Sequence, residues 1–119
     1  MTDRFHRDLV RGSLDLIVLS VLAEGPKYGY LIQKRIGDAS GDRLPLAAGT
    51  LYPLLHRLEG DKLIRARWDD STGRRRKWYD LTAAGRRRLG KQARDWGLFA
   101  ACVNRLLGPL LLKNDAKPA

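Results

Sequence analysis

The first strongly apolar segment of the chain is LDLIVLSVLA at residues 14–23. Ser13 before it suits a helix N-cap, and Gly25-Pro26 after it is a helix stop signal. Its hydrophobic positions lie on almost every side of a helix, which is typical of a helix that is buried on more than one face. We therefore expect part of this helix, including Leu14, to be covered by a second chain.

The next two segments have the hydrophobic period of amphipathic helices. In YGYLIQKRI at residues 28–36, one face carries Tyr28, Leu31, Ile32 and Ile36. In GTLYPLLHRLEGDKLI at residues 49–64, the i, i+3, i+4, i+7 positions are Leu51, Leu54, Leu55 and Leu58. Thr50 suits an N-cap, so Pro53 is expected in the first turn, where a missing N–H is tolerated.

After this third helix the hydrophobic period changes from about 3.6 residues to about 2. Residues 63–68 and 76–81 alternate around a Gly-containing turn, which predicts a β-hairpin with a basic second arm. Trp68 and Trp78 stand on opposite strands, and we expect both to cover one face of the hairpin. A last helix begins after Thr82 as N-cap.

Three helices followed by a hairpin is the order of a winged helix-turn-helix, in which the third helix enters the DNA major groove and the hairpin is the wing. The predicted fold class is mainly α with a β-hairpin, a winged helix-turn-helix plus a C-terminal dimerisation helix. We expect the DNA-binding domain over residues 10–81 and the dimerisation helix over 82–107. Gly108-Pro109 should end that helix, leaving 108–119 as a partly disordered tail.

The charge is concentrated in one stretch of the chain. The 119 residues carry a net charge of +10, and residues 65–94 hold 11 basic and 3 acidic side chains. Eight of the ten net charges therefore lie within thirty residues. A localised basic patch points to a polyanionic partner, usually nucleic acid.

The outer face of the third helix supplies the first candidate DNA-binding residues, which are Thr50, Tyr52, Pro53, His56 and Arg57. The alternative is that these residues make no DNA contact: Thr50 only caps the helix, Tyr52 packs under the wing, and His56 and Arg57 are solvated. Lys34 and Arg35 on the second helix are candidates for the flanking DNA backbone, although a solvated face explains them equally well.

The wing supplies the remaining candidates, which are Arg74, Arg75, Arg76 and Lys77. Side chains in a hairpin alternate between its faces, so not all four can reach the DNA together. We expect at least two of them to contact phosphates.

The last helix carries a seven-residue apolar repeat, which predicts a dimer interface. The members of the repeat are Leu89, Ala93, Trp96, Ala100, Val103, Leu107 and Leu110, and Phe99 widens its apolar face. The predicted interface residues are Leu14, Leu89, Ala93, Trp96, Phe99, Ala100, Val103 and Leu107. A helix after the wing has little of its own domain left to pack on, so a homodimer is favoured over a purely intramolecular core.

The composition excludes several other classes. The two histidines have no neighbours at metal-ligand spacing, and no phosphate loop, nucleophile elbow or paired cysteines occur. We predict no enzyme, no metal and no cofactor. No apolar run approaches the roughly 18 residues of a membrane span. The single cysteine and the mixed-charge N-terminus favour a cytoplasmic protein.

Three stretches of the chain resemble the PadR family of transcriptional regulators, in its short form with a single C-terminal helix. They are YGYLIQKRI at 28–36, GTLYPLLHRLEGDKLI at 49–64 and GRRRKWYDLTAAGRRRL at 73–89. The Gly-Thr-Leu-Tyr-Pro and Tyr-x-Leu-Thr-x-x-Gly elements at this separation are fairly specific, although each alone would be weak. The resemblance implies a winged-helix dimer that acts at inverted-repeat operators, as a repressor or another kind of regulator.

The family usually has glycine just before the Leu-Ile of the first strand, where this chain has Lys62. Lysine in a left-handed conformation costs on the order of 1 kcal/mol, so we expect a differently built turn. Several members are released by phenolic acids or other planar compounds. Trp96 lies between Ala93 and Ala100, so two copies could leave a gap for a small planar aromatic effector. The alternative is that Trp96 simply fills the dimer core.

Two other functions are compatible with the same residues. One is a basic architectural protein that binds nucleic acid without sequence preference, and the other is a winged-helix module whose basic face binds an acidic protein. A specific operator complex that survives excess random DNA separates a sequence-specific transcriptional regulator from both of these alternatives.

Overall fold

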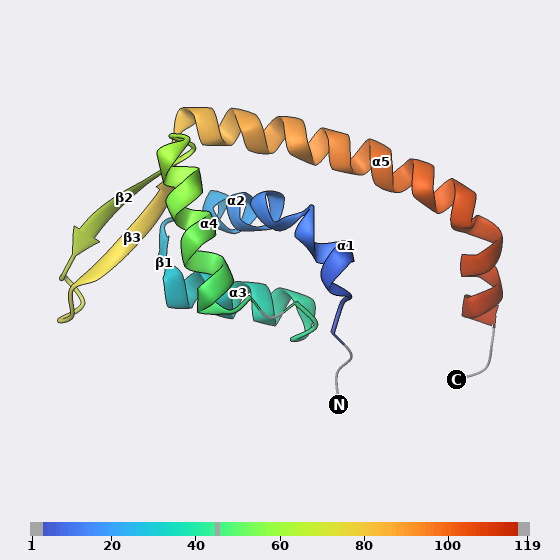
Figure 1. Cartoon of the computed structure of the whole chain (residues 1–119), viewed down its shortest axis with the longest axis horizontal. Coiled ribbons are helices and arrows are strands. Elements are labelled where there is room, and N and C mark those ends of the chain that lie inside the picture. Colours follow the sequence, from blue (N-terminus) through green and yellow to red (C-terminus); the bar gives the residue numbers. More distant parts are fainter. Residues whose placement is uncertain (1–3, 45, 117–119) are drawn as a thin grey trace. The chain divides into compact units, whose positions relative to one another are not determined.

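The computed structural model describes the backbone of residues 4–44 and 46–116, with side chains up to residue 110. Its elements in chain order are α1 (Arg7–Arg11), α2 (Leu14–Ala23), β1 (Lys27–Tyr28), α3 (Gly29–Ser40), α4 (Ala48–Gly60), β2 (Ile64–Asp69), β3 (Arg76–Leu81) and α5 (Ala83–Ala116), as labelled in Figure 1. Two compact units form, one reaching to Leu89 and one beginning at Gly90.

The core of the first unit lies between α2, α3, α4 and the base of the hairpin. The leucine stripe predicted on the third helix is buried, as are part of the apolar positions of α2 and, in α3, Ile32 and Ile36. The largest fully buried side chains are Val18, Leu19, Leu22, Ile32, Leu51, Leu55, Leu58 and Ile64. Burying such a side chain stabilises a fold by about 1.5–3 kcal/mol, so this cluster fixes how α4 is oriented in the unit.

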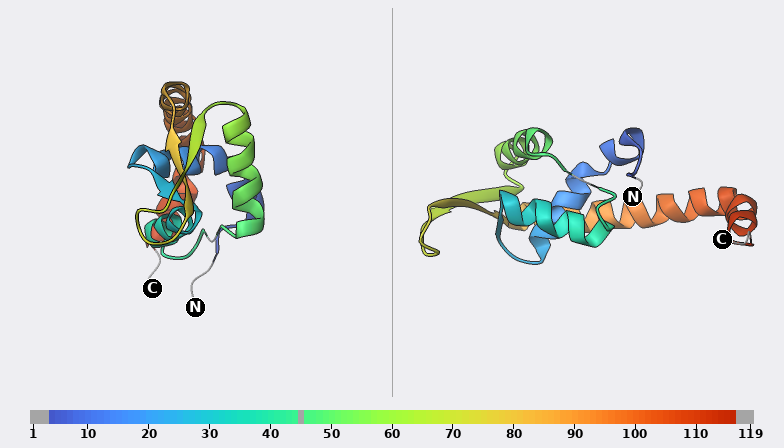
Figure 2. Two further views of the ribbon diagram at one scale, coloured as in Figure 1. Left: turned by 90° about the vertical axis from the view of Figure 1, so that its left-hand side faces the viewer. Right: turned by 90° about the horizontal axis from the view of Figure 1, so that it is seen from below.

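The sheet has three antiparallel strands in the order β1-β3-β2. Strands β2 and β3 form the predicted hairpin, which projects beyond the helices of its unit in Figure 2. Strand β1 was not predicted, because two residues are too few to show a period. It pairs Tyr28 with Trp78 and so joins the start of α3 to the hairpin.

The two hairpin tryptophans do not cover one face, so that prediction was wrong. The register pairs Trp68 with Lys77 and Arg67 with Trp78, which puts the tryptophans on opposite faces. Trp78 is half-buried and meets Tyr28 edge to face at 5.0 Å. Trp68 is 58% exposed. Alternation along each strand does not reveal which residues the turn sets opposite each other, and this register decides the faces.

Helix α4 begins before Thr50, which corrects the predicted start. Ala47 is the N-cap, with an extended backbone, and its carbonyl accepts from the N–H groups of Thr50 and Leu51. Pro53 therefore lies in the second turn. Its missing N–H would have bonded the carbonyl of Gly49, and Gly49 is exposed, so water can satisfy that group.

Helix α5 continues to Ala116 and does not end at Gly108-Pro109. The expectation that 108–119 forms a tail outside the helix was therefore wrong up to Ala116, while 117–119 lie outside the described residues. A proline removes one helical hydrogen bond, here to the carbonyl of Arg105, and bends a helix rather than always ending it. Figure 1 shows α5 changing direction toward its C-terminal end.

The turn from α4 into β2 has a left-handed residue at Lys62, so the expectation of a differently built turn was wrong. Lys62 has φ 61°. Its N–H donates to the carbonyl of Glu59, and the N–H of Leu63 donates to the carbonyl of Leu58, both at 3.0 Å. This pair of bonds is a Schellman motif, and the buried Leu63 and Leu58 supply its usual apolar contact.

The Tyr-x-Leu-Thr-x-x-Gly element ties the hairpin to the start of α5. Tyr79 and Leu81 are buried. The Thr82 hydroxyl donates to the carbonyl of Lys62 at 2.7 Å and accepts from the N–H of Gly85 at 3.0 Å, which caps α5. A Cβ on Gly85 would overlap the carbonyl oxygen of Leu63, so the helix can approach this closely only with glycine there.

Candidate nucleic-acid interface

The outer face of α4 is free of the core contacts that its leucines make. Thr50, Tyr52, Pro53, His56 and Arg57 are all exposed, and Tyr52 retains 46% of its surface. One helix therefore presents an apolar face to the core and a mixed polar face to solvent. This is the geometry that groove insertion of a recognition helix requires.

Tyr52 is held in place by the first residue of α3. A Cβ on Gly29 would overlap the Tyr52 hydroxyl and the ring carbon that bears it. Because glycine leaves that space open, the phenol ring lies against α3 while its other side faces solvent. The Tyr52 side chain is therefore packed on one side and exposed on the other. Neither of the two sequence-based alternatives, a DNA contact or packing under the wing, describes it alone.

The wing cations differ in how they are held. Arg75 lies over the ring of Trp68 at 4.9 Å from the centroid, and Arg76 lies over Tyr28 at 4.5 Å. A cation–π contact orients a guanidinium without neutralising it. Arg76 also donates to the hydroxyl of Thr72 at 2.9 Å.

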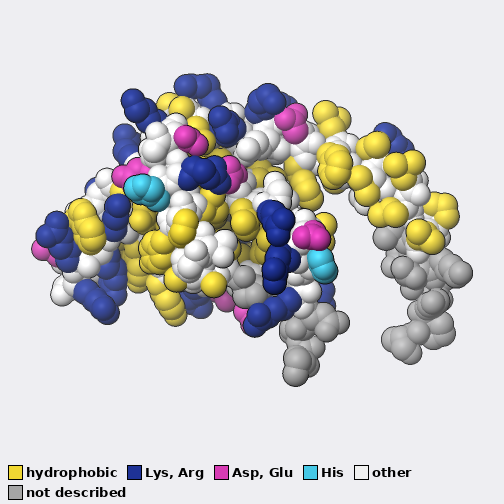
Figure 3. Space-filling model, viewed as in Figure 1, with side chains coloured by type: hydrophobic (Ala, Val, Ile, Leu, Met, Phe, Trp, Pro, Cys, Tyr) yellow, Lys and Arg dark blue, Asp and Glu magenta, His cyan; other side chains and the backbone are white. Residues whose placement is uncertain are grey.

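The other two wing cations lie in different surroundings. Lys77 is 3.6 Å from the carboxylate of Glu59, so its charge is partly compensated. Within the described part of the chain, the Arg74 side chain has no hydrogen bond or ion pair. Together the four residues retain most of their positive charge, and Figure 3 shows Lys and Arg side chains gathered over the hairpin.

A groove of about 780 Å³ joins the wing to the starts of α3 and α4. Its walls carry the wing cations together with aromatic residues, namely Tyr28, Tyr30, Tyr52, Trp68 and Tyr79. The sequence did not identify Tyr28, Tyr30 or Trp68 as site residues. The sequence does place aromatic residues beside basic runs, and this could have indicated the site. These segments come together in the fold only through the pairing of β1 with β3, which was not predicted.

Outside the wing, three predicted cations are engaged by acids of their own chain. Arg35 forms a bidentate ion pair with Glu24, with Nε–Oε1 and Nη2–Oε2 distances of 2.9 and 2.8 Å. The hydrogen bond from Arg35 lowers the pKa of the Glu24 carboxyl. Arg57 forms a similar pair with Asp15, with Nη2–Oδ1 and Nη1–Oδ2 distances of 2.6 and 3.2 Å. These pairs hold both guanidinium groups toward α2.

Lys34 is the third of these cations; it is exposed and lies 3.3 Å from Asp38, four residues on in the same helix. Exposed pairs of this spacing contribute about 0.3–0.5 kcal/mol, so Lys34 can leave Asp38 for a phosphate at little cost. Lys34 is therefore still available for a phosphate contact, whereas Arg35 is held by its hydrogen-bonded contacts with Glu24.

The second unit is one helix with a wide apolar face. Trp96 is 47% exposed and Phe99 is 63% exposed, and their rings meet at 6.4 Å between centroids. The remaining predicted interface positions on this stretch are Ala93, Ala100, Val103 and Leu107. Leu89 and Leu14 instead pack partly buried against the core of the first unit.

Residues 18–91 match the sequence profile of the Transcriptional regulator PadR-like family, a span that runs from α2 into α5. The chain belongs to this family. A transcriptional regulator of Mycobacterium tuberculosis is 34% identical over 88 residues, which cover 74% of this chain and 79% of that protein.

Solved structures of PadR-like regulators have the same fold. A PadR family transcriptional regulator from Eggerthella lenta is 39% identical, with a TM-score of 0.74 over 84% of this chain and 86% of that chain. A transcriptional regulator from Clostridium thermocellum is 33% identical, with a TM-score of 0.76 over 82% and 96%. The winged helix-turn-helix fold and the family predicted from sequence are therefore confirmed.

Two other kinds of feature are missing from the described residues of this PadR-like chain. The described residues contain no helix long and apolar enough to cross a bilayer. Nor, in the same part of the chain, do three or more His, Cys, Asp or Glu side chains cluster so that they could hold a metal ion.

Proposed function

We propose that this PadR-like transcriptional regulator binds double-stranded DNA sequence-specifically as a homodimer and represses transcription from an inverted-repeat operator. The outer face of α4 enters the major groove, and the wing follows the adjacent backbone. The observation that carries the proposal is the groove in which exposed Tyr52 faces the uncompensated cations Arg74, Arg75 and Arg76. We also propose that the protein is located in the cytoplasm with the DNA that it binds.

Within this interface the residues have different roles. Tyr52, Thr50 and His56 lie on the outer face of α4 and contact base edges or nearby phosphates. The wing cations contact phosphates, which adds affinity without sequence information. Arg35 and Arg57, which the sequence suggested as DNA-binding residues, instead brace α3 and α4 against α2 through Glu24 and Asp15.

The dimer is proposed from the apolar face of α5. Trp96, Phe99 and Leu106 are 47%, 63% and 77% exposed in one chain, and such contiguous apolar surface marks an interaction site. Pairing two copies buries it. A dimer covering its operator excludes other proteins from the same DNA, which is why we favour repression.

We extend the proposal to release by a small planar aromatic effector at Trp96, with Ala93 and Ala100 leaving space beside the indole. The effector changes DNA affinity only as far as it binds the DNA-competent and incompetent dimers unequally. Sedimentation of Trp96→Ala tests the interface, and an undiminished dimer would argue against it. Indole quenching by planar compounds tests the effector site, with Trp96→Phe as the control because Trp68 and Trp78 also emit.

Tyr52 provides the test of DNA readout. Tyr52→Ala should weaken binding to an operator selected from random DNA by about 1–3 kcal/mol more than binding to random duplex. Tyr52→Phe is the matched control, since it keeps the ring against Gly29 and removes only the hydroxyl. Equal losses on both DNAs with Tyr52→Ala would exclude base readout by this residue, and thermal melting checks that the fold is intact.

A further inference from the structure

Three exposed aromatic residues line the groove of about 780 Å³ between the wing and the starts of α3 and α4, called the wing groove from here on. They are Tyr30, Tyr52 and Trp68, which retain 62%, 46% and 58% of their surfaces. In a duplex each base is stacked between its neighbours, so only unpaired bases can stack on an aromatic side chain. Duplex binding therefore leaves the faces of these three rings unused.

Rings and cations alternate along the hairpin wall of the wing groove. Strand pairing puts Trp68 opposite Lys77 and Ala66 opposite Tyr79, so these four side chains share one face of the sheet. Arg75 lies over the Trp68 ring, and the Nζ atom of Lys77 lies 5.7 Å from the centroid of the Tyr79 ring. Figure 3 likewise shows hydrophobic side chains between Lys and Arg side chains over the hairpin. Proteins that bind single strands combine a cationic groove with aromatic stacking platforms in this way.

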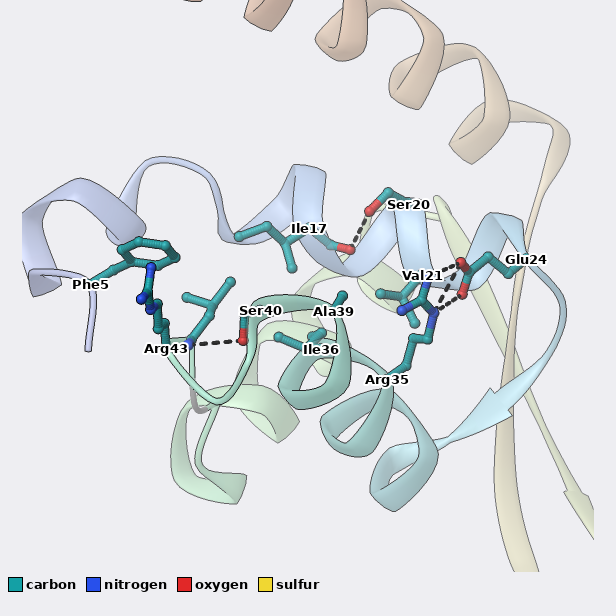
Figure 4. A pocket seen from close by; sticks show the side chains of 11 residues that line it. Phe5, Ile17, Ser20, Val21, Glu24, Arg35, Ile36, Ala39, Ser40 and Arg43 are labelled. Carbon is teal, nitrogen blue, oxygen red and sulfur yellow. Dashed lines mark hydrogen bonds and ion pairs between the residues drawn. The ribbon is translucent and has the colours of Figure 1, made fainter. Parts of the chain in front are cut away.

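The positive charge of the wing groove is not neutralised by its own lining. Its lining residues, all in the described part of the chain, include no Asp or Glu. Among its four cations, only Lys77 has an acidic partner within the described residues, namely Glu59. By contrast, Arg35 on α3 is paired with Glu24, and Figure 4 shows its guanidinium facing that carboxylate. The wing groove is thus complementary to a polyanion.

Two of its guanidinium groups are held on different strands of the sheet. Arg75 lies over Trp68 of β2, and Arg76 lies over Tyr28 of β1. Strands β1 and β2 are the two edges of the sheet, at two strand spacings or about 9–10 Å. Cations placed in this way suit successive phosphates of a strand better than the single phosphate of a free nucleotide.

We propose that the wing groove binds a single strand of nucleic acid with little sequence preference. Unpaired bases stack on Trp68 and on the exposed tyrosines, and phosphates accept hydrogen bonds from the wing arginines. Every base has a π face, so the stacking tolerates any sequence. A strand in the groove covers Tyr52 and therefore excludes duplex DNA from the outer face of α4. This activity goes beyond the proposed duplex binding and needs no operator.

The test compares two labelled 12-nucleotide strands by fluorescence anisotropy with the full chain. One strand is oligothymidine, and the other is abasic, with the same phosphates and no bases. Oligothymidine should bind about 10-fold or more tightly than the abasic strand, because stacking adds to the same electrostatic attraction. Trp68→Leu should remove most of this preference, whereas Trp68→Phe should keep it, since the two replacements differ mainly in the ring. Phe5→Leu is the matched control, because Phe5 is an exposed aromatic residue outside the wing groove.

Three results would overturn the inference: equal affinity for the two strands, equal effects of Trp68→Leu and Phe5→Leu, or thymidine monophosphate binding as tightly as oligothymidine. Thermal melting checks the fold of each variant. Tyr30→Leu and Tyr30→Phe repeat the comparison if Trp68→Leu does not fold.

Two further arms separate the sources of the strand and the two activities. Tighter binding of a 12-nucleotide oligouridine RNA than of oligothymidine would support the site with RNA as its strand, and the reverse order would support it with DNA. Wild-type protein that binds oligothymidine but no duplex would contradict the proposed function alone. Protein that binds an operator duplex but does not distinguish oligothymidine from the abasic strand would contradict this inference alone.

Discussion

Replacing Lys62 with glycine should stabilise this chain, and the structure gives the size of the effect. Lys62 has φ 61°, where a Cβ costs roughly 1–2 kcal/mol. Glycine also makes the unfolded chain more flexible, which opposes the gain by about 0.4–1 kcal/mol. The Schellman hydrogen bonds involve only backbone atoms and are kept. Relative to an uncharged residue with a Cβ, such as alanine, the net expectation for glycine is about 0.5–1 kcal/mol of added stability.

Lysine at this position has one compensating benefit, because a cation near a helix C-terminus contributes about 0.3–1 kcal/mol. Lys62→Ala is therefore the matched control, since it removes the charge and keeps the Cβ. Urea unfolding at one fixed protein concentration should rank glycine above lysine and lysine at or above alanine, with unchanged m-values. An alanine variant as stable as the glycine variant would refute the left-handed strain.

Three further predictions concern the wing and its attachment. Replacing Arg74 and Arg75 with alanine should weaken binding to all DNA and flatten the slope of log K against log salt by about 0.9 for each phosphate that is no longer neutralised. Gly85→Ala should destabilise the fold by about 1–3 kcal/mol in urea unfolding, because its Cβ would meet the Leu63 carbonyl. The Asp69 carboxyl should titrate at about pH 2 in carbon NMR, since hydrogen bonds from Ser71 lower its pKa from 3.8 to about 2.

Each of these has its own control and its own contrary result. An unchanged salt slope, or the same slope change in an Arg87 and Arg88 double variant, would mean that the wing arginines are solvated. Gly90→Ala should instead raise stability, since an added Cβ there meets only the end of the Arg94 side chain at 3.7 Å. A destabilisation of equal size would remove the special role of Gly85.

The pH dependence of the wing turn has a definite sign. Because the folded-state pKa of Asp69 lies below its ordinary value of 3.8, the ionised carboxylate stabilises the turn above that pH. The stabilisation is lost as the pH falls toward about 2. Ser71→Ala should move the titration back toward 3.8, and a wild-type midpoint already near 3.8 would contradict the hydrogen bonds to this carboxylate.

The sequence predicted the elements that have a clear hydrophobic period. The leucines of α4 and the alternation of the hairpin each depend on local spacing, which one chain displays in full. Element ends were less predictable. Helix α4 starts two residues before Thr50, and its N-cap, Ala47, has no capping side chain that the sequence could reveal. Helix α5 passes Pro109 because one missing hydrogen bond need not stop a long helix.

The site was only partly predictable, because its partners are distant in the chain. Nothing near Arg57 in the sequence indicates that it pairs with Asp15, 42 residues away. Arg35 likewise looks like any solvated cation until α2 brings Glu24 beside it. The space that Gly29 leaves for Tyr52 depends on how α3 meets α4, and this is a property of packing rather than of either segment.

Selection of bound duplexes from random DNA by the full chain tests the central claim most directly. We predict enrichment of an inverted repeat, with half-sites about one helical turn of 10–10.5 base pairs apart or a multiple of it. The enriched duplex should bind at least about 1,000-fold more tightly than random duplex at physiological salt. Enrichment of no sequence with uniform binding would indicate an architectural protein, and failure to retain any DNA would contradict nucleic-acid binding altogether.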